Sequence, residues 1–583
     1  MPVTDRFGEV RVTEHRHGDD LLSAGLGLRG LAGTSSAFAN PAAPTPVELR
    51  RRAIQASWKG IADLGPLGGF GTVYGRVPDV PGREFAAFAT LPGATSPHRV
   101  MVQVPDDFDR HTRCLVVTAS SGSRGVYGAI ALAGGWGLPR GCAVAYTDKG
   151  TGAGYFDPSD GNGVALDGTR APAGTVPLDF EPKGLSSGDG IAVKHAHSGD
   201  NPEADWGRHV LQAARFGLAM LDRAFPDDAP FTAKNTRIVA TGLSNGGGAV
   251  LRAAGDDDEG ILAAVVALEP NVYAPRARPF YDYATEAALF LPCALAAPAF
   301  DGLPFARVAN VAPPAWALRC ASLRAHGRLS SNTLAGQADE ALAMLRASGW
   351  EDDALKVGAS STSLDLWRAV TVAYASAYLK RPANHMPCGF SYRAQHANGL
   401  AGPADAAVRA AWWADGSGVP PGAGVALAGG TDLSLDPTLP GNLCLRDLWT
   451  GTGDEARALH EGVDATMAAL PRAGLPVFVV HGAQDGLIPV AFSSAPYVSW
   501  LRASGRSPVF WKVPYAQHFD AFLAFPDFGD RHAPLLPFGY AALDRTWAHL
   551  TEGRALPEDA AVRDARPRGA GPVTATGLGL PGN

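Results

Sequence analysis

The stretch T-R-I-V-A-T-G-L-S-N-G-G-G-A-V-L-R-A-A-G, residues 236–255, decides how the rest of the sequence is interpreted. It begins with a short apolar run typical of a β-strand and ends with small residues that permit a helix. Between them lies Gly242-Leu243-Ser244-Asn245-Gly246, a G-x-S-x-G pattern. Between a strand and a helix, this pattern is typical of a sharp turn that exposes a nucleophilic serine, with glycines where a Cβ would clash. Ser244 is therefore the candidate nucleophile.

A second match, Gly184-Leu185-Ser186-Ser187-Gly188, shows that the pattern alone is not specific. In a chain this rich in glycine, roughly one chance match is expected because only three positions are fixed. The second match follows Glu181-Pro182-Lys183, and the proline would deny a buried strand one of its backbone donors. No helical pattern follows it directly. Ser186 is therefore interpreted as a loop serine.

Bulk composition limits the class of protein. The chain has 583 residues, a net charge of −7 and a hydrophobic fraction of 46%. These values indicate a globular protein with a large core, and the absence of a basic run argues against nucleic-acid binding. The longest apolar run, residues 287–300, is short and interrupted by prolines, so no membrane span is expected. The N-terminus shows no apolar segment typical of a signal peptide.

Six cysteines allow two interpretations: buried free thiols, or three disulfides in an exported protein. Their spacing does not suggest a metal site. Cys114 and Cys142 flank one strand–helix–strand step, and the other four fall inside one long insertion, so sequential pairing is possible. Disulfides would favour an extracellular or periplasmic location, with a cytoplasmic location as the alternative. The cysteines are Cys114, Cys142, Cys293, Cys320, Cys388 and Cys444.

Apolar strand-like runs alternate with helical patterns in two parts of the chain, which predicts an α/β-hydrolase fold with a parallel sheet covered on both faces. Between residues 272 and 473 the alternation stops and helical pieces replace it. An insertion of this length predicts a large, mainly helical cap or lid between the late core strands. The predicted parts are a loop-rich segment 1–48, a first core part 49–271, the cap 272–473, a second core part 474–551 and an extended tail 552–583.

The cap contains tryptophans that are candidates for the walls of a substrate pocket, although most are expected to pack in the interior of the cap. They are Trp316, Trp350, Trp367, Trp412 and Trp413.

Ser244, Asp485 and His518 follow predicted strands in the chain order nucleophile, acid, histidine. In parallel α/β sheets such positions meet beyond the carboxyl ends of the strands. His518 would take the serine proton, and Asp485 would orient the imidazole and stabilise its charged form. Asp485 could instead be a turn residue, and Glu269 is the rival acid.

Other polar residues near these loops receive non-catalytic interpretations. His481 is expected to hold the acid loop, and Asp520 to be a supporting or surface group. His195 and His197 could suggest a metal, but no third ligand stands at a sensible spacing. No cofactor or metal is therefore expected.

An oxyanion hole requires two N–H donors. One is expected from Asn245, directly after the nucleophile, and the other from the loop after the strand at residues 114–118, near Ser123 or Arg124. For Arg124, binding of a substrate carboxylate and a simple salt bridge both remain open.

These residues resemble the D-(−)-3-hydroxybutyrate oligomer hydrolase family. The matching stretches are D-D-L-L-S-A-G-L-G at 19–27, S-S-G-S-R-G-V-Y-G-A-I at 120–130, R-G-C-A-V-A-Y-T-D-K-G at 140–150, K-H-A-H at 194–197, N-P-E-A-D-W-G at 201–207, S-N-G-G-G-A at 244–249 and Q-H-F-D-A-F-L at 517–523. The resemblance implies a serine esterase that cleaves short esters of (R)-3-hydroxybutyrate to monomer in polyhydroxybutyrate breakdown, with Ser244 as nucleophile. It also implies a small-molecule ester as the partner, and frequent export.

The family is similar at a distance to tannases and feruloyl esterases. Those enzymes have a cysteine beside both the serine and the histidine, whereas Leu243 and Gln517 occupy these positions here. An aryl-ester hydrolase of that type is the alternative function. A hydrolase fold that has lost activity and serves as a binding protein is the alternative from another class, although all three candidate catalytic positions are filled.

Overall fold

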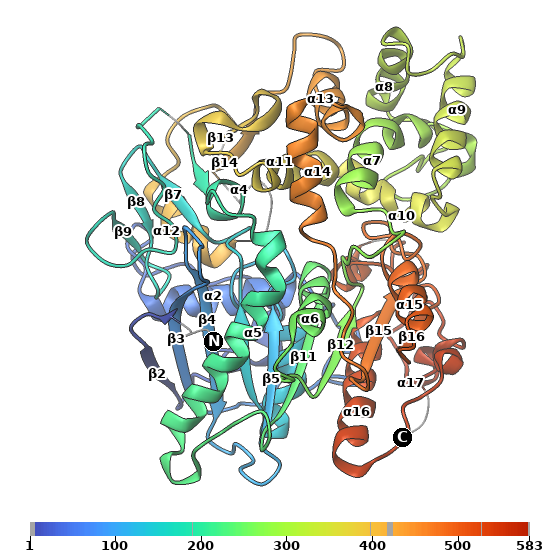
Figure 1. Ribbon diagram of the computed structural model, residues 1–583. Helices are drawn as coiled ribbons and strands as arrows, with labels where there is room; N and C mark the ends of the chain where they lie inside the picture. Colours follow the sequence, from blue (N-terminus) through green and yellow to red (C-terminus); the bar gives the residue numbers. More distant parts are fainter. Residues whose placement is uncertain (1–5, 189, 397, 417–423, 526, 581–583) are drawn as a thin grey trace.

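The computed structural model describes residues 6–188, 190–396, 398–416, 424–525 and 527–580 (Figure 1). Its main sheet has the strand order β1-β3-β4-β6-β5-β11-β12-β15-β16, with β2 paired to β3. Neighbours from β6 to β16 run parallel, and those from β1 to β6 through β3 and β4 run antiparallel. The strands are β1 Arg6–Phe7, β2 Arg11–His15, β3 Gly82–Thr90, β4 His98–Pro105, β5 Cys114–Ala119, β6 Ala143–Thr147, β11 Arg237–Leu243, β12 Ala264–Leu268, β15 Val477–Gly482 and β16 Val509–Val513.

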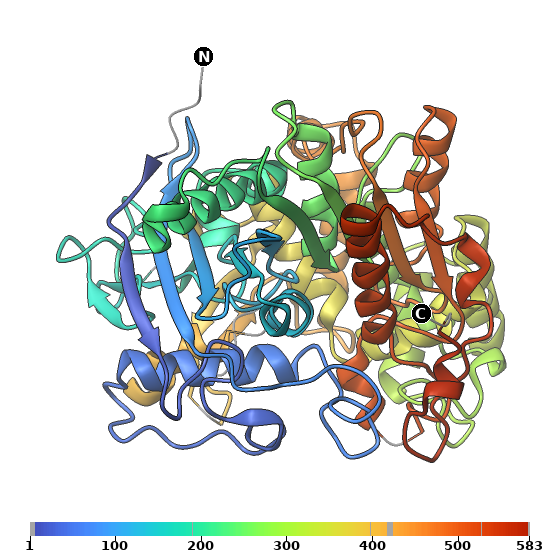
Figure 2. The same cartoon turned by 90° about the horizontal axis from the view of Figure 1, so that it is seen from below.

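The central strands are buried on both faces because helices cover each side of the sheet (Figure 2). Alternate residues of a strand point to opposite faces. Val239 and Val266 join one core with the helices α2 and α16, whereas Ile238 and Val265 join a second core with α5, α6 and α15. This layered order is an α/β-hydrolase fold, as the alternating pattern predicts. The helices are α2 Pro46–Lys59, α5 Pro202–Ala224, α6 Asn245–Asp256, α15 Ser494–Ala503 and α16 Leu536–Glu552.

The long segment between β12 and β15 is mainly helical, as predicted, and lies beyond one end of the sheet (Figure 1). It also contains a two-stranded ribbon, β13 Ser391–Ala394 with β14 Val425–Ala428. Its helices are α7 Phe280–Ala294, α8 Pro314–Ala325, α9 Leu334–Ala347, α10 Asp352–Ser363, α11 Leu366–Tyr378, α12 Ala406–Asp415, α13 Leu439–Thr450 and α14 Asp454–Asp464.

A second segment, between β6 and α5, packs against this insertion. Its Gly- and Asp-rich composition predicts a loop, but it forms a small sheet in the order β10-β7-β8-β9 and a short helix, α4. The Ile191 N–H donates to the carbonyl of Tyr392 at 2.9 Å, which joins the two segments. The prediction failed because strands of two or three residues carry no recognisable periodicity. The elements are β7 Tyr155–Asp157, β8 Asn162–Val164, β9 Arg170–Pro172, β10 Ala192–Val193 and α4 Lys194–His197.

Both ends of the described chain pack against the core. At the N-terminal end, β1 and β2 join the main sheet, Leu21 and Leu22 are fully buried, and a short helix, α1, spans Gly27–Ala32. At the C-terminal end, where the composition predicts an extended tail, Val573 donates its N–H to Leu67 at 2.9 Å and the short helix α17, Ala575–Leu578, follows. Apolar residues scattered through this segment therefore anchor it.

Three disulfides link Cys114 to Cys142, Cys293 to Cys320 and Cys388 to Cys444, the sequential pairing considered above. The first ties the start of β5 to the residue before β6, and the second ties α7 to α8. In the described ranges, no helix is both long and apolar enough to cross a membrane.

Candidate active site

Ser244 lies on a sharp turn between β11 and α6. Its backbone has φ 57° and ψ −125°, a conformation that residues with a Cβ rarely adopt. Two glycines make the turn possible. A Cβ on Gly242 would lie 2.4 Å from the carbonyl oxygen of Gly246, and a Cβ on Gly246 would lie 2.4 Å from that of Ala119. The turn therefore holds the Ser244 hydroxyl at the carboxyl end of the sheet, beside the N-terminus of α6.

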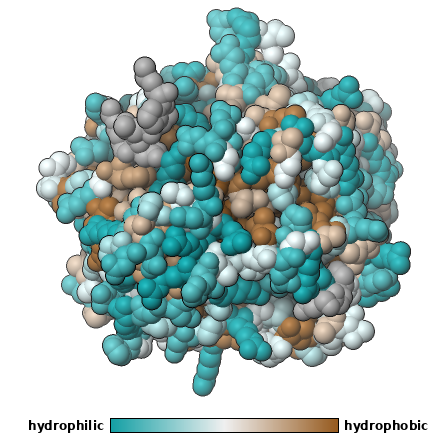
Figure 3. Space-filling view, turned by 60° about the horizontal axis from the view of Figure 1, so that its bottom comes forward, coloured by the Kyte–Doolittle hydropathy of each residue, from teal (hydrophilic) through white to brown (hydrophobic). Residues whose placement is uncertain are grey.

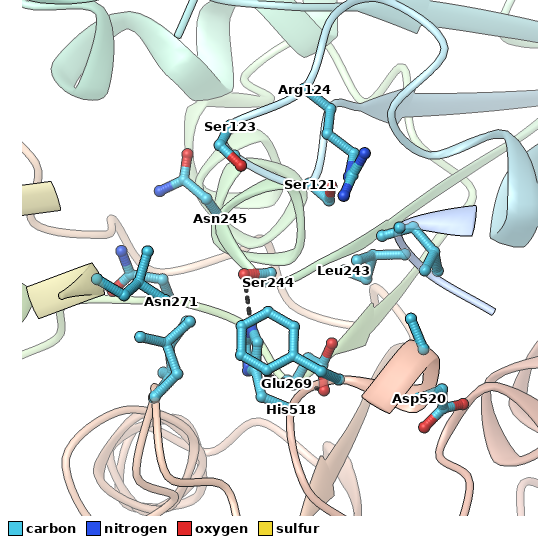
Figure 4. Close-up of a pocket in the computed structure, with 18 of the residues that line it drawn as sticks. Ser121, Ser123, Arg124, Leu243, Ser244, Asn245, Glu269, Asn271, His518 and Asp520 are labelled. Carbon is cyan, nitrogen blue, oxygen red and sulfur yellow. Dashed lines mark hydrogen bonds and ion pairs between the residues drawn. The ribbon is translucent and has the colours of Figure 1, made fainter. Parts of the chain in front are cut away.

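Three side chains that are far apart in the sequence meet at this turn. Ser244 Oγ lies 2.9 Å from His518 Nε2 (Figure 4), and His518 Nδ1 lies 2.7 Å from Asp485 Oδ2. Asp485 follows β15 and His518 follows β16, so each of the three residues comes from the end of a different strand. An imidazole that donates Nδ1–H to a carboxylate has its Nε2 lone pair free to accept the serine proton. The geometry is thus a continuous proton relay.

Hydrogen-bond donors surround the Asp485 carboxylate. Its Oδ1 accepts the N–H groups of Leu487 at 2.9 Å and Ile488 at 2.7 Å, and its Oδ2 lies 3.2 Å from His481 Nε2. Burial alone would raise the pKa of Asp485, but the charges and hydrogen bonds of His518 and His481 outweigh it and hold the pKa below its usual range. Asp485 is therefore an anion that can stabilise a charged imidazole.

Glu269, the rival acid, has the opposite environment. It follows β12 with φ 38°, and its Oε2 lies 3.8 Å from His518 Nδ1, beyond hydrogen-bond distance. This oxygen is buried and has no hydrogen-bond partner among the described residues. Burial, together with the charges of Asp485 and Asp520, raises the pKa of Glu269 well above its usual value. Its surroundings therefore favour the uncharged form, the opposite of their effect on Asp485.

Glu269, Asp485 and His518 also have the composition of a metal site, since their ligand atoms lie within 4.8 Å of one another. Two facts favour a proton relay. Both ring nitrogens of His518 are engaged by Ser244 and Asp485, and a carboxyl group that keeps its proton is a poor ligand. Elsewhere in the described ranges no three such side chains gather in this way, and His195 and His197 belong to no such group.

The expected oxyanion donors lie on facing elements. Asn245 is the first residue of α6, so its N–H has no acceptor within the helix. The loop after β5 approaches it closely, because a Cβ on Gly122 would lie 3.3 Å from Asn245 Cβ. Ser123 and Arg124 of that loop line the same cavity as Ser244 (Figure 4). This loop therefore lies where a second donor is required.

Arg124 extends from that loop into the cavity wall. Its Nη1 donates to the carbonyl of Ala56 at 3.0 Å. No described carboxylate forms an ion pair with it, so the salt bridge that the sequence left open is not found.

A buried ionic network that sequence reasoning missed lies behind Asn245. Lys149 Nζ contacts both the Glu203 carboxylate and Asn245 Oδ1, and His195 Nε2 lies 2.7 Å from Glu203 Oε1. Burial alone would raise the pKa of Glu203, but Lys149 and His195 outweigh it and lower the pKa. The network holds the Asn245 side chain, and so the first turn of α6. Its members come from three stretches quoted for the family resemblance, 140–150, 194–197 and 201–207, which were the available signal.

Ser244 faces a cavity of about 450 Å³, within the usual range for small-molecule sites. The wall is mainly apolar and is built by the insertion and by the segment after His518. Two wall residues, Leu364 and Phe525, are 56% and 42% exposed. Figure 3 shows apolar side chains gathered around a hollow on one face of the molecule, as expected for such an opening. The apolar wall residues include Phe280, Leu364, Leu366, Val370, Tyr374, Phe519, Phe522, Phe525, Leu535 and Leu536.

The five cap tryptophans do not line this cavity, so the prediction that some are wall residues is wrong. All five are buried within the molecule, and Trp350 packs edge-to-face against Trp367 at 6.1 Å. Large aromatic rings stabilise the cap interior, whereas leucines and phenylalanines at the starts of α7, α11 and α16 and in the segment after His518 reach the cavity.

The remaining candidates have clear positions. His481 Nε2 lies 2.8 Å from the carbonyl of Ile488, which anchors the loop of Asp485. Asp520 is buried in the cavity wall and accepts the N–H groups of Leu535 and Leu536. Burial raises the pKa of Asp520 to about 7 despite these bonds. Ser186 lies exposed in a loop, as interpreted from the sequence.

The model of the 3HB-oligomer hydrolase family matches residues 3–580 of this chain. The chain belongs to the 3HB-oligomer hydrolase family. Relatives named D-(-)-3-hydroxybutyrate oligomer hydrolase include that of Paracidovorax citrulli, 39% identical over 96% of this chain and 89% of that protein. Those of Polaromonas naphthalenivorans and Burkholderia cenocepacia are both 37% identical, over 96% and 98% of this chain and 89% and 90% of the relatives.

Among solved structures, this 3HB-oligomer hydrolase family member is similar to feruloyl esterase B from Aspergillus oryzae. That comparison has a TM-score of 0.33 and 11% identity, and covers 95% of this chain and 89% of the other. Tannin acyl hydrolase from Aspergillus niger gives a TM-score of 0.37 and 14% identity, covering 83% and 81%. The sheet order and the turn at Ser244 show the α/β-hydrolase fold.

Proposed function

We propose that this chain is a serine esterase that hydrolyses short oligomers of (R)-3-hydroxybutyrate to the monomer. The relay from Ser244 through His518 to Asp485, which faces an apolar cavity, carries the proposal. The family and the names of its relatives support the substrate class. No cofactor enters the scheme.

In the first half-reaction, Ser244 Oγ attacks the carbonyl carbon of the scissile ester while His518 Nε2 takes the hydroxyl proton. A new C–O bond forms and the carbonyl electrons move to the oxygen. Asp485 stabilises the charged imidazole, which then gives its proton to the departing alcohol oxygen as the ester C–O bond breaks. An acyl-enzyme and one hydroxyl-bearing product result.

In the second half-reaction, water takes the place of the alcohol. His518 accepts a water proton, the oxygen attacks the acyl carbon, and the proton passes to Ser244 Oγ as the acyl group leaves. In both halves the negative oxygen receives hydrogen bonds from the Asn245 N–H and from the loop that contains Ser123 and Arg124. The positive end of the α6 dipole adds to this stabilisation.

We propose further that residues 272–473 are a cap on a core made by residues 49–271 and 474–551. Its side chains Phe280, Leu366 and Val370 form part of the cavity wall. Such a cap would admit short, soluble chains and exclude the surface of a solid polymer. Replacing Val370 with tryptophan should therefore reduce turnover of the trimer more than that of the dimer, and an equal reduction would contradict the role of the cap.

The central test is Ser244→Ala. It should remove turnover of the 3-hydroxybutyrate dimer and trimer, and labelling by a fluorophosphonate, while the circular dichroism spectrum stays unchanged. Retained turnover would exclude Ser244 from the mechanism. Parallel assays of the wild type on a feruloyl ester separate the substrate classes, since faster hydrolysis of that ester would favour an aryl-ester hydrolase.

Three disulfides also support an extracellular or periplasmic location, because such bonds persist in oxidising compartments. Cell fractionation with thiol labelling tests this. The cysteines should resist labelling without a reductant, and free thiols in a cytoplasmic fraction would contradict the proposal.

A further inference from the structure

We propose that Arg124 binds the free carboxylate of the substrate, so that the cavity selects oligomer acids over neutral esters. The inference rests on the proposed function and adds to it the group by which the substrate is recognised.

Arg124 is a cation without a counter-ion among the described residues. A guanidinium carries five N–H donors, and the only described hydrogen bond from that of Arg124 goes to the carbonyl of Ala56. Two buried arginines are paired with carboxylates, Arg50 with Glu84 at 2.8 Å and Arg319 with Asp436 at 2.6 Å. Buried Arg252 instead donates to three backbone carbonyls, whereas Arg124 is partly buried and makes one such bond. An enclosed charge without a partner is costly. Its donors therefore point to an anion that comes from outside the chain.

The neighbouring backbone leaves room for this side chain. Gly60 follows α2 with an ordinary φ of −79°, so backbone conformation does not require glycine there. A Cβ at Gly60 would instead lie 1.8 Å from Arg124 Nη2. Burial lowers the pKa of Arg124 to about 10, which still leaves it charged at neutral pH. The site is thus shaped around a charged guanidinium at the cavity wall.

The other ionisable groups of the wall leave this charge uncompensated. Burial raises the pKa of Glu269 and so disfavours its charged form, and Asp520, with a pKa of about 7, is only partly ionised at neutral pH. Lys59, exposed in the same lining, adds a second positive charge. A cavity with apolar walls and a net positive charge attracts an anion with an aliphatic body.

An oligomer of a hydroxy acid has this character. Each chain carries one carboxylate, at its acid end, and the remaining units are neutral esters. In the dimer the carboxylate belongs to the half that leaves as 3-hydroxybutyrate when Ser244 attacks the ester carbonyl. Binding by Arg124 would therefore hold the leaving half, and the interior of a long polymer would offer nothing to bind.

The experiment compares the dimer acid with its methyl ester on wild type and Arg124→Gln. Loss of one charge-assisted interaction should reduce kcat/KM for the acid roughly 10- to 100-fold, chiefly through KM. Turnover of the methyl ester, which offers no carboxylate to residue 124, should fall by a clearly smaller factor than turnover of the acid. Arg124→Lys should restore part of the activity on the acid. An equal loss on both substrates, or no loss on the acid, would overturn the inference.

Arg51→Gln is the matched control. Arg51 lies on α2 and also donates to a backbone carbonyl, that of Ala24, at 3.1 Å, but it does not line the cavity. It should leave the preference for the acid unchanged. Gly60→Ala, which crowds the guanidinium, should lower activity on the acid selectively. If Arg51→Gln lowered kcat/KM for the dimer acid as much as Arg124→Gln, the effect would not come from the cavity.

A measurement on the wild type covers the case in which Arg124→Gln fails to fold. With p-nitrophenyl butyrate as a neutral reporter substrate, 3-hydroxybutyrate should inhibit at least about 10-fold more strongly than its methyl ester. Equal inhibition constants would overturn the inference while leaving the esterase intact. A wild type that hydrolyses neither the dimer nor its methyl ester would instead refute the proposed function, and this inference with it.

Discussion

The ends of β12 and β15 each present a buried carboxyl group to His518, but the pKa values of the two groups are shifted in opposite directions. Asp485, after β15, lies 2.7 Å from the imidazole and accepts two backbone N–H groups. Glu269, after β12, lies 3.8 Å away, and one of its oxygens has no partner among the described residues. Both groups are buried, so the comparison shows that the donors at each strand end decide in which direction the pKa shifts.

The same comparison explains why one imidazole can work between two acids. If both carboxyl groups were charged, their repulsion would add to the cost of burying each. The pKa of Asp485 is lowered and that of Glu269 is raised, so the surroundings favour one negative charge beside His518 rather than two. A pair of titratable groups with opposite shifts is what a site needs to fix one protonation state.

The largest expected effect comes from Asp485→Asn. The N–H groups of Leu487 and Ile488 would hold the amide oxygen, so the amide NH2 would face His518 Nδ1 and could neither accept Nδ1–H nor stabilise a charged imidazole. The kcat/KM on the dimer should therefore fall by about 10³- to 10⁴-fold. Steady-state kinetics on the dimer, with the rate of fluorophosphonate labelling as a second readout, measures this. A loss smaller than about 10-fold would mean that Glu269 serves as the acid after all.

A smaller effect, on stability, should come from Glu269→Gln. The folded pKa of Glu269 lies above the unfolded value, so its contribution to stability is present below about pH 4.5 and is lost as pH rises. Each unit of that shift costs about 1.4 kcal/mol at high pH. Glutamine removes this cost, so urea unfolding at pH 8 should show a more stable variant and one at pH 4 should not.

In the same unfolding assay, Asp485→Asn should change stability with the opposite pH dependence. The folded pKa of Asp485 lies below the unfolded value, so its contribution is present above the unfolded pKa and lost as pH falls. The substitution should therefore destabilise the protein at pH 8 more than at pH 3. Equal pH profiles for the two variants would show that the environments of the two carboxyl groups do not differ.

The strands and turns of the core could be predicted from the sequence because local sequence patterns determine them. The strand around Val239, the turn at Ser244 and the loops after the late strands follow from apolar runs and from glycines that steric contact requires. A parallel sheet then gathers the strand ends at one edge. The proximity of Ser244, Asp485 and His518 thus follows from the topology of the sheet, although the three residues lie far apart in the sequence.

The residues around the relay are brought together by long-range packing, so local sequence patterns could not predict them. Lys149, after β6, and Glu203, in the first turn of α5, are 54 residues apart in the sequence and meet only in the folded chain. The raised pKa of Glu269 depends on its burial and on nearby carboxyl groups in the folded chain, which the sequence does not reveal. The cap tryptophans illustrate the converse error, since residue type alone could not tell the cap interior from the cavity wall.

The smallest expected effect concerns Asp520, a third carboxyl group near the relay. Burial and the charge of Asp63 raise its pKa to about 7, so it gains its charge as pH rises through that value. The new negative charge in the cavity wall should weaken binding of an anion but not of a neutral ester. The ratio of KM for the dimer acid to KM for its methyl ester should therefore rise roughly 2- to 5-fold between about pH 6 and pH 8.5.

Taking the ratio removes every ionisation that affects both substrates equally, including that of the relay itself. Asp520→Asn should give a flat ratio, because the amide still accepts a backbone N–H but cannot ionise. Arg124 stays charged across the interval, since its pKa lies at about 10. If the ratio rose as steeply in Asp520→Asn, the charge change would belong to another group. Glu269→Gln would then be the variant to test, because Glu269 is the other carboxyl group of the wall whose pKa is raised.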